Sequence, residues 1–304
     1  MASHITELPT DAVSIIMGFL DTQGLRNFRQ VNRWAENEAF HTFALRGYNE
    51  VKVRGYRDAI ARLTKVVQDS PRLATSIKSL RVVFNSTDRL ELRHAIQAER
   101  KWPPLAKIHQ KELTVSSLMA ALPKLGKLTL EGMDSDSFAW HWKGTSRAIA
   151  VSKAPQEAVS KANVLEQETP TEPKLAISVL NLTCCHLTTA DMKCLLSMFG
   201  TTVTGMCLYD VGLKNFGWRQ TLGTIMNDLL HLEDVEITTV ARPTTSFQSL
   251  NIWWDQERFV KAIRGEQGIA MVQLQDHHAR MKGKEAVKLG LETIFEHMYG
   301  GPDW

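Results

Sequence analysis

Short apolar segments recur from about residue 70 of this chain onward and restrict its fold. Each segment is suited to a β-strand, and several are followed by an amphipathic helical pattern. The clearest three begin at residues 177, 203 and 232, which places them 26 and 29 residues apart. Further segments begin at residues 77, 125 and 269. A strand and helix pair of this length cannot bury its own apolar faces and needs stacked neighbours. The spacing therefore predicts an α/β solenoid.

Two of the segments fit the leucine-rich spacing LxxLxLxx(N/C)xL. The first runs from Ile177 to Leu187 with Cys185 at the N/C position, and the second runs from Val203 to Leu213 with Val211 there. Because 43% of the residues are hydrophobic, single matches arise by chance, and the argument depends on the alternation with helices. One helix is predicted to start near Thr188 and end at Gly200, and a second to lie between residues 216 and 230.

The composition excludes several functional classes. With 36 basic and 33 acidic residues the net charge is only +3, which does not predict a nucleic-acid partner. No apolar run approaches the ~20 residues that a membrane span requires, so no membrane association is expected. The motifs GxxxxGK[ST], GxGxxG, GxSxG and HExxH are absent. We therefore expect neither an enzyme nor a cofactor.

The cysteines predict a reducing location. Cys184, Cys185, Cys194 and Cys207 form no CxxC pair, and four cysteines in 304 residues do not make a disulfide framework. Buried, reduced thiols are favoured over a metal site. The first residues also carry Glu7 and Asp11 within their apolar stretch, which is unlike a secretory signal. The expected location is cytoplasmic, nuclear or both.

The first 46 residues predict three short helices. Val13, Ile16, Met17 and Leu20 recur at helical spacing, and two further apolar patterns follow at residues 25–31 and 34–43. The connections between the helices are only two or three residues long. So small a unit cannot hide all these side chains internally. Part of the apolar surface should therefore be covered by something else.

This opening block, ELPTDAVSIIMGFLDTQGLRNFRQVNRW, resembles the F-box, a three-helix module that docks on the Skp adaptor of SCF ubiquitin ligases. With the apolar segments that follow, the whole chain is similar to fungal F-box proteins with irregular leucine-rich repeats of the ribonuclease-inhibitor type. The resemblance implies adaptor contacts at Leu8, Pro9, Val13, Ile16, Met17, Leu20, Leu25, Phe28, Val31, Asn32 and Arg33.

Four regions follow from this interpretation. They are an F-box-like module (1–46), a linker helix with the first irregular repeats (47–142), a mobile polar insertion (143–173) and a repeat region with a C-terminal helix (174–304). The apolar residues after Trp253 and Trp254 predict a helix, and another is expected at about residues 284–298. The aromatic cluster at residues 138–142 is predicted to pack inside the repeats.

The implied function is to hold a protein target near the cullin-RING scaffold, which the Skp adaptor bridges, without catalysis. Outward residues of the strands would bind that unidentified target; they are Arg81, Thr129, Asn181, Thr183, Tyr209, Glu236 and Gln273. Two alternatives remain. The chain could be a repeat protein outside ubiquitin chemistry whose first helices cap the solenoid, or an enzyme whose site no motif reveals.

Overall fold

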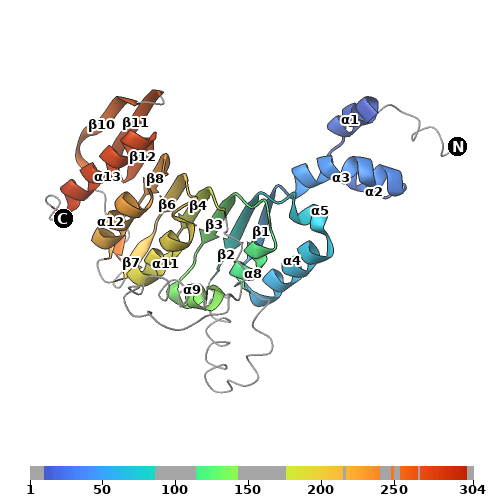
Figure 1. The fold of residues 1–304 in the computed structure, drawn as a ribbon, viewed down its shortest axis with the longest axis horizontal. Coiled ribbons are helices and arrows are strands. Elements are labelled where there is room, and N and C mark those ends of the chain that lie inside the picture. Colours follow the sequence, from blue (N-terminus) through green and yellow to red (C-terminus); the bar gives the residue numbers. More distant parts are fainter. Residues whose placement is uncertain are drawn as a thin grey trace, which may run out of the picture.

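The computed structural model describes residues 10–85, 114–142, 176–214, 217–239, 248–249, 254–265 and 268–299. It is a mixed α/β structure built around a nine-stranded, mostly parallel sheet. In Figure 1 the row of strands follows an arc, with a helical module at one end and antiparallel strands at the other. None of the helices in these ranges has both the length and the apolar character needed to cross a membrane.

The helical module consists of α1 (Thr10–Phe19), α2 (Thr22–Arg29) and α3 (Arg33–Gly47). Local capping sets the helix boundaries. The Asp21 carboxylate accepts a hydrogen bond from the Gly24 amide at 2.6 Å, and the Asn32 side chain accepts one from the Ala35 amide at 2.8 Å. Each cap satisfies a backbone donor that the first turn leaves unpaired. The three predicted helices are confirmed.

Six parallel strands of five residues each make up most of the sheet. They are β1 (Glu50–Arg54), β2 (Ser79–Val83), β3 (Lys127–Glu131), β4 (Val179–Thr183), β6 (Gly205–Tyr209) and β8 (Asp234–Thr238). Each strand begins directly opposite the first residue of its neighbour, so the stack has no stagger. The sequence analysis predicted five of these strands and missed β1.

Helices lie along one side of this stack (Figure 1). They are α4 (Arg57–Asp69), α5 (Pro71–Ala74), α8 (Val115–Ala120), α9 (Ser135–His141), α11 (Thr189–Phe199) and α12 (Trp218–Asp228). The predicted helix starting near Thr188 is confirmed, because the Thr188 hydroxyl and the Asp191 carboxylate form a reciprocal cap at the start of α11. Between helices and sheet lies one continuous apolar core, and all five template positions from Ile177 to Leu187 are fully buried.

The corners after β3, β4 and β6 repeat the same backbone geometry. Gly132, Cys184 and Asp210 each follow a strand directly and each has a positive φ, of 70°, 51° and 50°. Their amides donate to the carbonyl of the last residue in the next strand. At Gly132 a Cβ atom would lie 2.3 Å from the Phe84 carbonyl oxygen, so only glycine fits there. Short strands beyond these corners form a second sheet: β5 (His186–Thr188), β7 (Gly212–Lys214) and β9 (Gln248–Ser249).

The far end of the sheet corrects two expectations. The predicted helix after Trp253 is wrong, because β10 (Trp254–Gly265) is a strand paired antiparallel with β11 (Gly268–Asp276). Strand β11, predicted from residue 269, pairs antiparallel with β12 (His278–Lys282), which joins β8. This part of the chain therefore does not continue the parallel stack. The C-terminal helix is confirmed as α13 (Lys284–Tyr299), while residues 143–173 lie outside the described ranges.

Candidate functional site

The helical module has a small core of its own, separate from that of the stack. Val13, Met17, Leu25, Ala39 and Phe43 form this cluster, and each is at most 9% exposed. Because these five side chains fill the space between the helices, other side chains of the module must face outward.

Among the described residues of the module, five large apolar side chains are exposed: Ile15, Ile16 and Phe19 on α1, Val31 before α3, and Leu45 on α3, which is 38% exposed. We call the first four the apolar docking surface. Ile15, Ile16 and Phe19 on α1 are 63%, 45% and 87% exposed, and Val31 before α3 is 61% exposed. Exposing this much apolar side-chain area in one small unit is unfavourable unless another surface covers it. Phe19 is the largest of the four and the least buried.

The structure divides the predicted adaptor contacts into distinct groups. Val13, Met17 and Leu25 are a correction: they lie in the module's interior and are at most 5% exposed, so they shape the fold instead of offering surface. Ile16, Val31 and Arg33 are exposed, while Leu20 and Phe28 are half-buried. Asn32 is exposed and caps α3. Leu8 and Pro9 lie outside the described residues.

The sequence analysis missed Ile15 and Phe19. Both lie on α1, four residues apart, and therefore on one helix face that differs from the predicted apolar stripe. The available signal was the run Ile15-Ile16-Met17, in which adjacent apolar residues cannot all point to the same side of a helix. An apolar residue off the buried stripe of a short helix indicates a second, outward apolar face.

The second candidate surface is the face of the sheet that points away from the helices. Five of the seven predicted target-binding residues lie in one continuous row of directly opposed strand positions: Arg81, Thr129, Asn181, Glu236 and Gln273. The other two, Thr183 and Tyr209, are opposite each other in the neighbouring row. The register thus brings together residues that are up to 192 positions apart, from 81 to 273.

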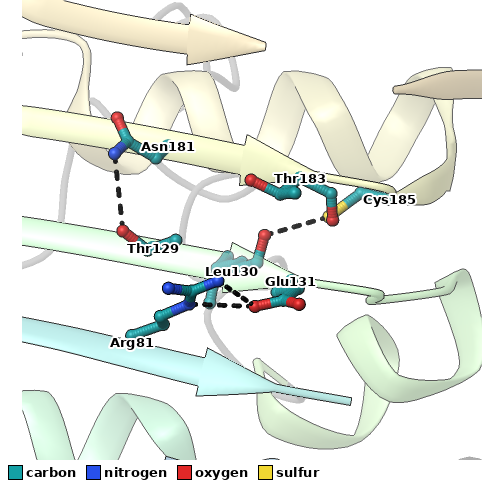
Figure 2. Close-up of polar contacts among 7 residues, drawn as sticks. All are labelled: Arg81, Thr129, Leu130, Glu131, Asn181, Thr183 and Cys185. Carbon is teal, nitrogen blue, oxygen red and sulfur yellow. Dashed lines mark hydrogen bonds and ion pairs between the residues drawn. The ribbon is translucent and has the colours of Figure 1, made fainter. Parts of the chain in front are cut away.

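Polar contacts tie this row to the strands beside it (Figure 2). The Arg81 guanidinium donates to the Glu131 carboxylate through Nε at 2.9 Å and through a terminal nitrogen at 2.7 Å. The Asn181 amide reaches the Thr129 hydroxyl at 3.5 Å. Thr129 is only 9% exposed, so it supports its neighbours more than it offers surface. Tyr209, the aromatic residue among the predicted target-binding residues, has a side chain that is accessible to solvent, with 42% of the residue exposed.

Charged and thiol groups continue the row toward the antiparallel strands. The Glu236 carboxylate lies 3.2 Å from Nε2 of His278. Cys207 lies between Asn181 and Glu236, and its pKa is raised, first by burial and then by the negative charge of Glu236. A raised pKa keeps the thiol protonated at neutral pH and makes it a poor nucleophile.

Buried polar groups of the stack act in packing. Burial raises the pKa of the Cys185 thiol to about 12, and its sulfur contacts the Leu130 carbonyl oxygen at 3.3 Å (Figure 2). The His141 side chain is fully buried, which lowers its pKa to about 4, and its Nδ1 accepts a hydrogen bond from the Val115 amide at 3.3 Å. Phe138 and Trp142 are buried beside it, so the packing prediction for this cluster is confirmed for these three residues.

The described cysteines form no disulfide. Cys185 is buried as predicted, whereas Cys184, Cys194 and Cys207 are only partly buried. Within the ranges that the structure describes, no group of three or more histidine, cysteine, aspartate or glutamate side chains is placed to hold a metal ion.

Comparison with models of known protein families and with curated proteins finds no match for this chain.

Proposed function

We propose that this chain is a non-catalytic substrate-recognition subunit of an SCF-type ubiquitin ligase. The helical module would dock on a Skp-type adaptor, and through it on a cullin-RING scaffold, while the open face of the sheet would hold a target protein. In such an assembly the chain contributes by raising the local concentration of the target near the charged conjugating enzyme.

The observation that carries the proposal is the apolar docking surface. Ile15, Ile16, Phe19 and Val31 remain exposed although the module has already closed a core of its own. Covering such side chains with a partner would remove apolar area from water, which favours association. The surface also belongs to the helices whose sequence resembles the F-box, and Ile16 and Val31 are common to it and to the contacts that the resemblance implies.

A capture experiment with a purified Skp-type adaptor tests the proposal. Phe19→Asp in the full chain should abolish capture, because it places a charge at the centre of an apolar contact. Its matched control is Leu230→Asp, which changes an apolar side chain that is 62% exposed on the stack and should leave capture unchanged. Circular dichroism should show the same helix content in both variants. Failure of the unaltered chain to capture the adaptor, or equal capture by Phe19→Asp, would overturn the assignment.

A second candidate is a repeat protein outside ubiquitin chemistry, in which the module only caps the stack. One observation favours it: Phe40 and Tyr48 of the module pack against the core of the stack, and Arg72 of α5 lies 4.5 Å from the centre of the Phe40 ring. This contact leaves the apolar docking surface uncovered, however. The same capture experiment separates the two functions, since a plain cap predicts no adaptor binding.

A further inference from the structure

A groove of about 1080 Å³ lies between α2 and α3 in the helical module. Its lining contains three arginines, Arg26, Arg29 and Arg33, and a single acidic residue, Glu36. Phe43 and Tyr48 add aromatic surface to the lining and pack edge to face, with ring centres 5.6 Å apart. The groove therefore combines an excess of positive charge with an apolar surface.

Arg29 is held in place within this groove. Its guanidinium carbon lies 4.4 Å from the centre of the Phe43 ring and 5.2 Å from that of Phe40, and one terminal nitrogen is 3.4 Å from the Glu36 carboxylate. The Arg29 Nε atom is buried without a hydrogen-bond partner. A guanidinium fixed by aromatic rings loses little conformational entropy when it binds a carboxylate.

Arg26 and Arg33 are the other two arginines of the groove lining. Both are exposed, and neither forms a hydrogen bond or ion pair with any residue in the described part of the chain. Arg26 lies in the last turn of α2, where a positive charge stabilises the helix, so its position has an explanation within the module. Arg33 is the first residue of α3, where a positive charge is unfavourable for the helix, so its charge has no such explanation. Arg33 therefore adds to the positive charge of the groove without stabilising its helix.

The groove adjoins the apolar docking surface. Val31 lies between Gln30 and Asn32, both of which line the groove. At the other end the lining begins at Thr22, three residues after Phe19. A partner that covers Val31 would consequently lie beside the groove.

The geometry points to an acidic protein segment as the occupant of this groove, with carboxylates paired to Arg26, Arg29 and Arg33 and apolar stems against the half-buried Tyr48. The affinity for carboxylates is argued from the groove alone, whereas its use by the adaptor depends on the proposed function. Carboxylates bind arginine through two parallel hydrogen bonds, which makes the pairing geometrically specific.

Fluorescence anisotropy with a labelled glutamate-rich helical peptide tests the groove directly. The full chain should bind this peptide, and more weakly as salt is raised, but not the peptide in which glutamine replaces every glutamate. The double variant Arg26→Gln, Arg33→Gln should weaken binding about tenfold or more. The control Lys65→Gln, Lys124→Gln removes the same charge from exposed positions elsewhere and should change binding less than about twofold.

Two results would overturn the inference: equal binding by the arginine variant and the lysine control, or equal binding of the glutamine peptide. The adaptor experiment separates this inference from the proposed function. If Phe19→Asp loses the adaptor and the arginine variant keeps it at full affinity, the adaptor does not use the groove and the ligase function stands. If the groove binds the acidic peptide and the unaltered chain captures no adaptor, the ligase function fails and the acidic specificity stands.

Discussion

The helical module and the stack of parallel strands bury their apolar side chains to very different extents. In the stack, Leu80, Leu128 and Leu180 lie side by side in one inward row and are fully buried against the helices. In the module, five side chains fill the interior, while the apolar docking surface stays in solvent. The difference follows from size, because a larger unit covers a larger fraction of its apolar surface. The stack thus keeps its largest apolar side chains out of water, whereas the module leaves Phe19 87% exposed.

The largest expected effect tests whether the two cores are independent. Leu182→Ala should lower the free energy of unfolding of the stack by about 2–5 kcal/mol, because Leu182 is fully buried and its loss leaves a cavity. Urea denaturation followed by tryptophan fluorescence measures this, since Trp142 and Trp218 are buried in the stack. Leu25→Ala should leave that transition in place. A comparable shift for Leu25→Ala would show that the module and the stack unfold as one unit.

A second effect is a loss of stability in acid, which we expect in the stack because His141 is buried there. Burial lowers the pKa of His141 from 6.5 to about 4, so the unfolded chain binds a proton more readily than the folded one. The free energy of unfolding is therefore highest, as far as His141 is concerned, above pH 6.5. It decreases as the pH falls from 6.5 toward 4, by up to about 1.4 kcal/mol per pH unit. Denaturation at a series of pH values measures the slope.

The matched variant is His141→Asn, which retains an acceptor for the Val115 amide and removes the titrating group. Its stability should be lower at neutral pH and should change less between pH 6.5 and 4. An unchanged slope in this variant would assign the acid sensitivity to other groups.

The smallest effect is local to the module. Arg46 donates to the Leu20 carbonyl oxygen and, at 2.7 Å, to that of Gly18, so it holds the end of α1 against α3. Arg46→Gln should weaken this attachment by about 1 kcal/mol. Hydrogen exchange should then be faster for the amides of α1 and unchanged for those of β4 and β6. Faster exchange in the strands as well would contradict the separation of the two regions.

The sequence predicted the fold best where its pattern was regular. Five of the six parallel strands and the helices between residues 188 and 230 follow from the spacing of buried residues and from the Thr188 cap. Strand β1 was missed because only Val51 and Val53 mark it, although β1 begins 29 residues before β2. The helix after Trp253 was wrong because pairing with β11 decides the structure of that segment, and pairing partners are not visible in local periodicity.

The candidate site was predictable only in part. Alternation along each strand gave the outward positions, and the common register then placed Arg81, Thr129 and Asn181 in one row. The module was harder, since a residue such as Leu25 has the same chemical character whether it lies inside the cluster or on its surface. Only the packing of α1 against α3 decides that Ile15 and Phe19 face outward.

The absence of stagger in the parallel stack sets a fixed length scale on its open face. Side chains at matching positions of neighbouring strands repeat about every 4.8 Å, the distance between hydrogen-bonded strands. A molecule lying across β2, β3, β4, β6 and β8 would meet one group per step along a straight line. The groups by which that molecule contacts the sheet would have to recur at multiples of about 4.8 Å. An extended peptide that runs along the strands does not have this spacing, because its alternate side chains are about 6.6–6.8 Å apart.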